Sequence, residues 1–424
     1  MGLAEFIRRE FSFIKGNYRI LVISWMIMDL ASEMPGPNFQ LYVHDVLGGK
    51  GVALGIIGLA GFLGMAAVAF PGGYLADKYG RRWLITTMTF GMALSHLFFA
   101  LAPSWPITFL GITLWGWHFI LLGITVNSLC LIYQPALFSM VQDSLPPERR
   151  GMGSSIIQLI HSTFNTPGPI IAGFLLLRFG LEGSMRIIYL LVTTLFLIAA
   201  VWRLRLKETV TSGDRIRFSY FVSSYPKAIK ESFGVWKVVP RSMLWLLVSQ
   251  IVVMFGSSVT NVINALYAVN QLHIPQEQWW LVFVPLLVTM IVASIPIGKA
   301  VDKIGRKIPL VLGLFVFAAG TAIFMMGNLF TVMVAMIFFG LGQLLFMASM
   351  MALATDLVAA ENRGKINGFT NFTGYIMMGT GMLLGNYLYV SFFPQLPFYI
   401  TLAMIIPTLF MVLFLVHEPA KKEN

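Results

Sequence analysis

Two carboxylic acids interrupt an otherwise apolar stretch near the N-terminus, MIMDLASEMPGPNFQLYV (26–43). Asp29 and Glu33 are four residues apart and therefore share one face of a helix. Two neighbouring carboxylates in a medium of low dielectric do not both ionise easily, which suits a proton carrier or a site for a cation. The alternative is a protonated structural pair that is hydrogen-bonded to its neighbours. Pro35-Gly36-Pro37 follows directly, and we expect it to break the helix and free backbone carbonyls beside the acids.

Further polar side chains follow helical spacing. One stripe has intervals of 7, 4 and 3 residues, which is one face of a helix: Gln250, Ser257, Asn261 and Asn264. We expect it to line a substrate cavity together with Trp117, Asn127, Gln134, Gln343 and Met347. Aromatic rings and methionines around few polar groups suit a broad, apolar-tolerant pocket. The alternative for the stripe is hydrogen bonding between helices.

Histidines are candidates for proton transfer because an unperturbed imidazole titrates near neutral pH. His118, in the predicted fourth helix, is the one we assign to proton coupling, next to Asp29 and Glu33. A hydrogen-bonded structural role is the alternative for His118, and it is the role we expect for His96 and His161.

These residues must be held by membrane helices. The 424 residues are 57% hydrophobic and only 11% charged, whereas soluble domains average about 25% charged residues. The apolar residues come in runs of about 20, enough to cross a bilayer as a helix. We predict an all-α integral membrane protein with twelve spans: 18–44, 51–76, 83–102, 106–141, 152–177, 186–203, 241–270, 279–300, 308–327, 330–357, 366–391 and 395–416. The fourth span is long enough to need a tilt or a protruding end.

The basic residues predict the orientation. If both termini are cytoplasmic, all of the 29 lysines and arginines except Lys50, Arg178 and Arg186 lie in or beside cytoplasmic segments. This distribution explains the net charge of +11 through topology and contact with lipid headgroups, without a nucleic-acid partner. We expect a multi-pass protein of the plasma membrane.

An internal repeat divides the chain. GGYLADKYGRR (72–82) matches IGKAVDKIGRK (297–307), and DSLPPERRG (143–151) matches DLVAAENRG (356–364). The matched turn residues include Gly73, Asp77, Gly80, Arg81 and Arg82 in the first half, and Gly298, Asp302, Gly305 and Arg306 in the second. Gly80 and Gly305 are expected to allow a backbone reversal between two helices. We therefore predict two parallel six-helix repeats, 1–203 and 241–424, joined by a cytoplasmic linker, 204–240.

GGYLADKYGRR resembles the signature turn of the major facilitator superfamily, and IGKAVDKIGRK resembles its counterpart in the second half. The resemblance covers nearly the whole chain and implies that family's fold. In the family this turn clamps the two halves on the cytoplasmic side while the cavity faces outward. Carried over, Asp77 would lie near the start of the eleventh helix, and Arg81 would hold it. The alternative is a turn that serves only topology and folding.

Two further segments resemble the drug:proton antiporter branch of that family. The proline-rich break after Glu33 is similar to its first-helix motif. HSTFNTPGPIIAG (161–173) is similar to its fifth-helix motif through Gly168, Pro169 and Gly173, although Phe164 and Ala172 stand where glycines are expected. A proline kink with close packing is the alternative. The fourth helix lacks the arginine that many of these antiporters carry.

The leading hypothesis is a secondary transporter that works by alternating access and exports amphipathic or cationic small molecules in exchange for protons. A uniporter or symporter of a small polar metabolite is the alternative, and a non-transporting receptor is the alternative from another class. The sequence has no phosphate-binding loop, metal-ligand cluster or nucleophile pattern, so we expect no cofactor, no metal and no enzymatic activity. We expect a monomer whose partners are a small-molecule substrate, protons and lipids.

Overall fold

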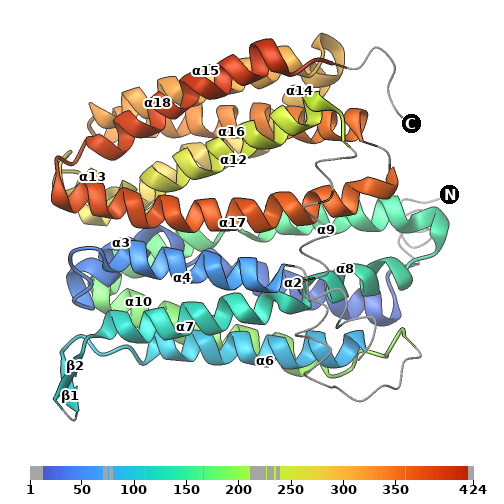
Figure 1. Ribbon diagram of the computed structural model, residues 1–424. Helices are drawn as coiled ribbons and strands as arrows, with labels where there is room; N and C mark the ends of the chain where they lie inside the picture. The colour runs from blue at the N-terminus through green and yellow to red at the C-terminus, as the bar shows by residue number, and fades with distance from the viewer. Residues whose placement is uncertain are drawn as a thin grey trace, which may run out of the picture.

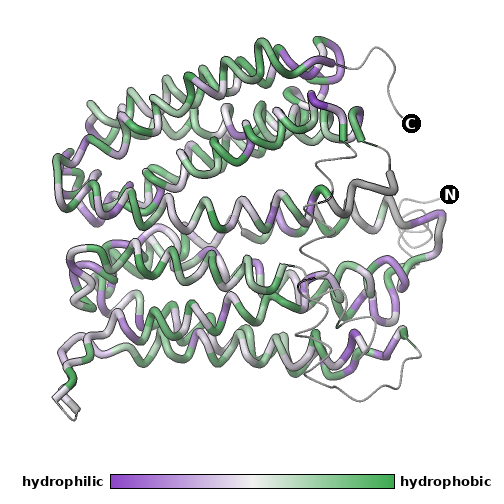
Figure 2. Tube along the Cα trace, in the orientation of Figure 1, coloured by the Kyte–Doolittle hydropathy of each residue, from purple (hydrophilic) through white to green (hydrophobic). Residues whose placement is uncertain are grey.

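The computed structural model describes residues 13–69, 75, 80–109, 111–165, 167–210, 226, 234, 239–358 and 360–418. Helices make up nearly all of the fold, in two halves that lie one above the other in Figure 1. Figure 2 shows hydrophobic residues along the helices and hydrophilic residues mainly near their ends. This distribution is typical of a bundle surrounded by lipid.

The first half begins with a broken helix and ends with a long kinked one. Its elements are α2 (Gly16–Ser32), η1 (Gly36–Asn38), α3 (Phe39–Leu41), η2 (Tyr42–Val46), α4 (Ala53–Val68), α6 (Arg81–Ala100), β1 (Ile107–Phe109), β2 (Ile112–Leu114), α7 (Gly116–Cys130), η3 (Leu131–Tyr133), α8 (Gln134–Asp143), η4 (Pro147–Arg149), α9 (Arg150–Asn165) and α10 (Pro167–Arg203). Helix α10 holds parts of two predicted spans. A kink at Gly180, whose backbone is non-helical with φ 66° and ψ −179°, separates them.

The second half repeats the general order of helices, and no strand is found in its described residues, 239–358 and 360–418. Its elements are α12 (Arg241–Asn261), α13 (Asn264–Asn270), η6 (Gln276–Val282), α14 (Phe283–Ile304), α15 (Lys307–Met325), α16 (Leu329–Leu357), α17 (Ala360–Ser391), α18 (Leu396–Phe410) and η7 (Met411–Leu415). Within the described residues, eight helices are long and apolar enough to cross a membrane. The kink in α10 adds one span, and α2, α4 and α17 occupy the remaining three predicted spans, so the helix order follows the prediction.

One predicted boundary is wrong. The fourth span was expected to begin at residue 106, but Ile107 to Leu114 form an antiparallel hairpin, and α7 begins at Gly116. β-branched residues favour strands, and Gly111, with φ 77°, allows the tight reversal. The expected protruding end of the fourth span is therefore a hairpin. It marks the left-hand end of the molecule in Figure 1, here called the hairpin end.

The opposite end carries the start of α6 at Arg81, and Gly305 and Arg306 just before α15, and is here called the arginine end. The hydrophobic core shows how the halves meet. Second-half residues near the hairpin end, among them Ile263, Trp279 and Phe324, belong to the same buried cluster as the first half. Second-half residues near the arginine end form a separate cluster around Leu246, Leu310 and Leu353. The halves are therefore packed together at the hairpin end, where α17 also lies against α4.

Candidate functional site

The first helix breaks where the sequence predicts it. Helix α2 ends at Ser32, and η1 begins at Gly36 after the first proline of the Pro-Gly-Pro segment. The carbonyl oxygen of Pro37 accepts a buried hydrogen bond of 2.8 Å from the indole N–H of Trp279. A polar group of the second half therefore satisfies a carbonyl that the break exposes, and the break becomes part of the contact between the halves.

The carboxyl pair has a histidine partner. Asp29 is 7% exposed, and its Oδ2 lies 3.3 Å from Nδ1 of His161 on α9. Glu33 is exposed, and its Oε2 lies close to Gly36, so that a Cβ on that glycine would lie 3.9 Å away. Sequence reasoning assigned His161 a structural role. Its partner on α2 is 132 positions earlier in the sequence, and no spacing rule joins the two.

The fifth-helix motif packs directly against this cluster. A Cβ on Gly168 would lie 3.0 Å from the backbone nitrogen of Met34 and 3.1 Å from the backbone carbon of Glu33. Pro169 is buried beside it. Gly173 lies against the indole ring of Trp280 in the second half. The two glycines therefore bring α10 close both to the end of α2 and to the opposite half.

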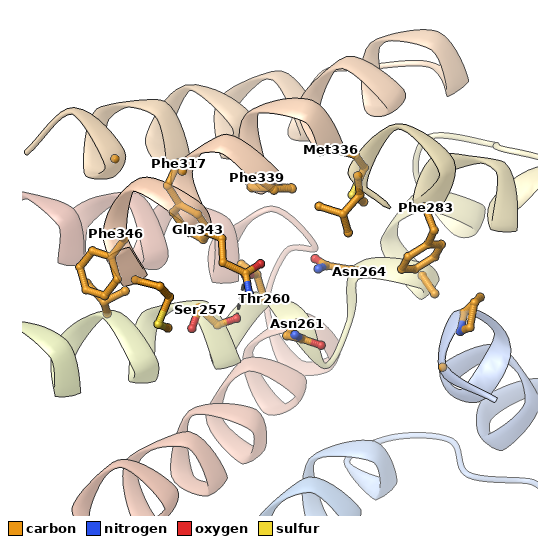
Figure 3. A pocket seen from close by; sticks show the side chains of 18 of the residues that line it. Ser257, Thr260, Asn261, Asn264, Phe283, Phe317, Met336, Phe339, Gln343 and Phe346 are labelled. Atoms are coloured by element: carbon orange, nitrogen blue, oxygen red, sulfur yellow. Dashed lines mark hydrogen bonds between the residues drawn. The ribbon is translucent and has the colours of Figure 1, made fainter. Parts of the chain in front are cut away.

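A cavity of about 440 Å³ lies in the second half (Figure 3). Predicted cavity residues on its wall come from α12, from the residues after it and from α16: the polar Ser257, Asn261, Asn264 and Gln343, and the apolar Met347. The rings of Phe283, Phe317, Phe339 and Phe346 supply much of the remaining wall. Of the described residues that line it, none is charged. This second-half cavity therefore offers carboxamides, a hydroxyl and aromatic rings.

The helix of the predicted seventh span, 241–270, is also broken. Helix α12 ends at Asn261, and α13 begins at Asn264. Gln40 of the first half fills this break. Its Nε2 donates to the carbonyl oxygen of Asn261 at 2.5 Å, and its Oε1 accepts from the backbone N–H of Ala265 at 2.9 Å. Sequence reasoning did not single out Gln40. A polar residue shortly after the proline break was the one available signal.

A second cavity, of about 410 Å³, lies on the first-half side of this contact. It shares Gly36, Gln40 and Asn261 with the second-half cavity. Asn127 is on its wall, where Nδ2 donates to Oγ of Ser95 at 3.0 Å. The contact between Gln40 and Asn261 therefore adjoins two cavities, one lined mainly by the second half and the other mainly by the first.

The other predicted cavity residues lie elsewhere. Gln250 lines a small cavity of about 170 Å³ with Met347. Gln134 lines a gap of about 460 Å³ between α8 and α17. Trp117 and His118 lie in the first turn of α7 and line neither the cavity of about 440 Å³ nor that of about 410 Å³. The Nδ1 of His118 accepts from the backbone N–H of Trp115 at 3.0 Å, so the imidazole caps the helix rather than joining Asp29 and Glu33.

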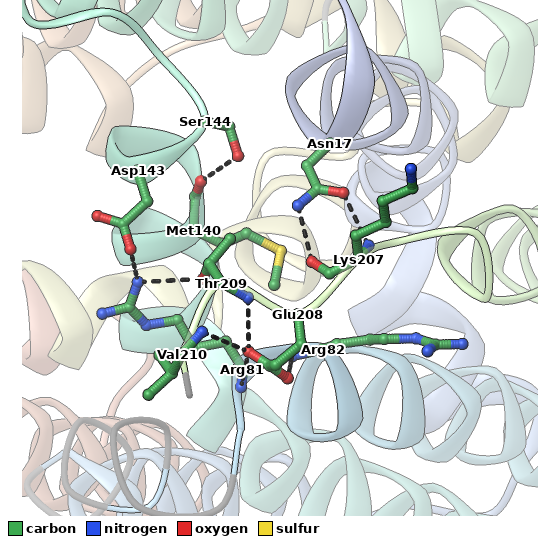
Figure 4. Close-up of polar contacts among 10 residues, drawn as sticks. All are labelled: Asn17, Arg81, Arg82, Met140, Asp143, Ser144, Lys207, Glu208, Thr209 and Val210. Carbon is green, nitrogen blue, oxygen red and sulfur yellow. Dashed lines mark hydrogen bonds and ion pairs between the residues drawn. The ribbon is translucent and has the colours of Figure 1, made fainter. Parts of the chain in front are cut away.

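The described residues of the repeated turns match between the halves, and Figure 4 shows the contacts of those in the first half. Gly80 and Gly305 have φ of 96° and 100°, which confirms the predicted backbone reversal. Arg81 forms an ion pair with Asp143, and Arg306 lies 3.0 Å from Asp356. The internal repeat aligned Arg81 with Arg306 and Asp143 with Asp356. In each half, the arginine of one repeated turn therefore pairs with the aspartate of the other repeated turn.

A glutamate caps the helix after each turn. Glu208 accepts from the backbone N–H groups of Arg81 and Arg82 at 3.0 Å, and Glu418 accepts from those of Arg306 and Lys307 at 2.8 and 2.6 Å. Such contacts satisfy amides that a helix start leaves unpaired. Gly298 and Asp302 lie in the last turns of α14, while Gly73 and Asp77 lie outside the described residues.

Comparison with known proteins agrees with this arrangement. The family model described as Major Facilitator Superfamily matches residues 21–249 and 246–424. The "Uncharacterized MFS-type transporter YhjO" of Bacillus subtilis (strain 168) is 23% identical over 402 residues, 92% of each chain. A "Na(+), Li(+), K(+)/H(+) antiporter" of Planococcus maritimus is 25% identical over 175 residues, 39% of this chain and 37% of the relative.

Among solved structures, the crystal structure of the nucleoside transporter NupG matches with a TM-score of 0.70 at 15% identity, covering 95% of this chain and 100% of that one. This likeness concerns the fold, and the match of the family model rests on the sequence itself. Since that model covers nearly the whole chain in two consecutive matches, the chain belongs to the Major Facilitator Superfamily of membrane transporters.

Proposed function

We propose that this transporter exports an amphipathic small molecule in exchange for protons, by alternating access. The observation that carries the proposal is the buried carboxyl of Asp29, 3.3 Å from the imidazole of His161 and one helical turn from Glu33. Three groups that can each take up a proton are thus gathered at the break of the first helix. A histidine beside a carboxylate can hold or release a proton as the surroundings change.

Asp29, Glu33 and His161, here called the coupling cluster, share a boundary with the two cavities. Exchange of a substrate for protons requires such a boundary. Glu33 approaches Gly36, and Gly36 lies on the walls of both cavities that adjoin the contact between Gln40 and Asn261. A positive charge on a bound substrate would meet the nearest carboxylate here, because the described cavity walls carry none. Substrate and proton would then compete for Glu33 and Asp29, and that competition is the physical basis of antiport.

The predicted orientation bears on the conformational state of the transporter. If the arginine end is cytoplasmic, as the distribution of basic residues predicts, the packed hairpin end faces outside and this is an inward-facing state. The gap between α8 and α17, lined by Gln134 and Tyr375, is consistent with that state. We propose a monomer in the plasma membrane with both termini cytoplasmic, in which segment 204–240 links the two moving halves.

The partial relative supports exchange against protons, since its name describes a cation/proton antiporter. A second candidate, a uniporter or symporter of a small polar metabolite, is favoured by one observation. The second-half cavity is uncharged and carries the side chains of Asn261, Asn264 and Gln343, which can hydrogen-bond a neutral solute. The likeness of the fold to a nucleoside transporter makes a nucleoside a useful neutral probe.

The test uses purified protein in weakly buffered detergent solution with a pH-sensitive dye. Tetraphenylphosphonium, ethidium and uridine are added in turn, and their binding is measured in parallel. We expect tetraphenylphosphonium or ethidium to release protons, and we expect Asp29→Asn, Glu33→Gln or His161→Gln to reduce the release at least fivefold. His118→Gln is the matched control and should retain full release, because His118 lies outside the cluster.

Binding of tetraphenylphosphonium or ethidium without any release of protons would overturn the antiport proposal. Saturable uridine binding, with no proton released, would instead favour the second candidate. Proton release that survives all three cluster substitutions would place coupling outside the first helix and would also contradict the proposal.

A further inference from the structure

The β-hairpin between α6 and α7 has one apolar face and one polar face. Residues that oppose each other in an antiparallel pair share a face of the sheet. Thr108 opposes Thr113, and their hydroxyl oxygens lie 3.2 Å apart on one face. Ile107 opposes Leu114 on the other face, which Ile112 shares because side chains alternate along a strand. Strands β1 and β2 therefore form a small amphipathic ribbon.

The apolar face of this ribbon is not covered by the described protein. Ile107 is 41% exposed, Ile112 65% and Leu114 36%. The hairpin projects from the ends of α6 and α7 on the side away from the second half (Figure 1), and β1 and β2 pack mainly on each other. A two-stranded hairpin on its own is marginally stable in water. An exposed apolar face on such a hairpin therefore calls for a partner that covers it.

Tryptophans stand at both ends of the hairpin. Trp105, just before β1, is 63% exposed, and Trp115, just after β2, is 39% exposed. The indole ring of Trp115 also packs so closely on Gly48 that a Cβ on that glycine would clash with it. Tryptophan is enriched where a membrane meets water. The base of the hairpin is thus fixed to the first half, with aromatic side chains typical of a membrane interface.

The surroundings of the hairpin are uncharged. The sequence contains no Asp, Glu, Lys or Arg from Trp83 to Gln142. Leu94 of α6 and Leu101, directly after that helix, are both more than half exposed. The apolar surface of a membrane helix therefore continues onto the hairpin, and the partner that matches such a surface is lipid.

The backbone of the hairpin sets the depth at which lipid can cover it. Among the described residues each strand pairs only with the other, so the outer edge of each strand has no strand partner. Unpaired backbone groups do not enter the hydrocarbon core of a bilayer. The boundary between lipid headgroups and acyl chains satisfies both needs, because it covers an apolar face and leaves the edges hydrated.

We propose that the hairpin is a membrane anchor, which lays the face formed by Ile107, Ile112 and Leu114 on the interfacial layer of the leaflet at the hairpin end. Under the predicted orientation this is the outer leaflet. The partner is a lipid surface with any headgroup, since the hairpin carries no charge that selects anionic lipids. The anchor goes beyond the proposed exchange of substrate and protons, because it involves neither the coupling cluster nor the cavities.

The experiment places a fluorophore on the hairpin of the full chain in phosphatidylcholine nanodiscs. Cys130→Ala removes the only cysteine, and Ile112→Cys is then labelled with nitrobenzoxadiazole. We expect strong quenching by lipids that carry a doxyl group at carbon 5 and weak quenching by iodide in the water. Salt should not change this pattern. Glu277→Cys, an exposed position of η6 in the second half, is the control and should show the reverse pattern.

A matched pair of charged variants tests which face meets the lipid. Leu114→Asp places a charge on the apolar face of the labelled hairpin, and Thr113→Asp places one on the threonine face. Leu114→Asp should lower the quenching by doxyl lipids at least about threefold, because a charge is expelled from apolar surroundings. Thr113→Asp should leave it nearly unchanged. Unfolding temperatures of all variants verify folding.

Three results would overturn the proposal. Quenching of the label at Ile112→Cys by iodide as strong as at Glu277→Cys would place the hairpin in water. Equal losses in the two folded aspartate variants would mean that no particular face meets the lipid. Rapid disulfide formation between unlabelled Ile112→Cys chains in vesicles would mean that a second copy of the chain covers the face instead.

Discussion

The side chain of Gln40 replaces the helical hydrogen bond that is missing between Ala265 and Asn261. In an unbroken helix the N–H of residue 265 would donate to the carbonyl of residue 261. Here that N–H donates to Oε1 of Gln40 at 2.9 Å, and Nε2 of Gln40 donates to that carbonyl at 2.5 Å. A residue of the first half thus completes the seventh helix, and it can do so only while the halves are closed at the hairpin end.

Gln40→Leu should loosen this closure. The substitution keeps the size of the side chain but removes both hydrogen bonds, each worth about 1 kcal/mol. We expect amide hydrogen exchange in the segment Asn264–Asn270 to become roughly tenfold faster, as measured by mass spectrometry. Gln134→Leu, the same change in the gap near α8, should leave exchange in this segment as in the wild type. Unchanged exchange in Gln40→Leu would show that other contacts hold the hairpin end closed.

The sequence predicted the elements of this site better than their contacts. Pro35 and Pro37 predicted a helix break because proline removes a backbone donor, and the spacing of Ser257 and Asn261 placed both on one face of α12. Asn264 begins α13 beyond a second break, and Gln250 lines a different cavity. The proline break and the spacing each act within one helix. Gln40 and Asn261 are separated by 221 positions, and their contact depends on how two breaks meet across the halves. No local pattern contains that information.

The dependence on contacts between helices also explains the other differences between the sequence predictions and the structure. Asp29 was recognised as exceptional because a carboxyl is costly in an apolar segment, but His161 could be assigned to it only once α9 was packed against α2. His118 was chosen for its position in the fourth helix, yet it lies at the helix start, where its imidazole caps the backbone. The repeat correctly aligned Arg81 with Arg306 but could not say that each would meet an aspartate from a different turn.

The two ion pairs of the arginine end should differ in strength. Asp356 is 14% exposed and Arg306 13%, whereas Asp143 is 42% exposed. Neutralising Asp356 leaves a largely buried guanidinium without its carboxylate, which costs about 3 kcal/mol. Neutralising Asp143 should cost less, because that carboxylate is screened by water and because Arg81, itself only 12% exposed, also donates to the hydroxyl of Thr209 at 3.4 Å. Chemical denaturation in detergent should therefore show Asp356→Asn to be the less stable variant. Equal losses would mean that exposure does not decide the strength of these pairs.

Gly168 should not tolerate a methyl group. A Cβ there would lie 3.0 to 3.1 Å from backbone atoms of Met34 and Glu33, and backbone cannot move aside as a flexible side chain does. We expect Gly168→Ala to cost about 1–3 kcal/mol through overpacking, and to weaken proton release because it displaces Glu33. The measurements are thermal unfolding and the pH-dye assay.

Gly298→Ala is the control for that change. Gly298 is also a glycine within a helix, but a Cβ there would meet no described atom within 4 Å. Alanine favours the helix by up to about 1 kcal/mol over glycine, so this variant should be as stable as the wild type or slightly more stable. If Gly168→Ala were equally well tolerated, the motif would not be a point of close helix contact.

Trp279 and Trp280 allow the hydrogen bond to Pro37 to be measured against an internal control. The indole N–H of Trp279 donates to the carbonyl of Pro37 at 2.8 Å, while that of Trp280 has no partner among the described residues. Substitution of either residue by phenylalanine removes similar apolar surface. Only Trp279→Phe also leaves a buried carbonyl of the first-helix break unpaired, which costs about 1–3 kcal/mol. Thermal unfolding should therefore show Trp279→Phe to be less stable than Trp280→Phe. The reverse order would mean that the ring of Trp280 against Gly173 contributes more to joining the halves than the hydrogen bond to the break does.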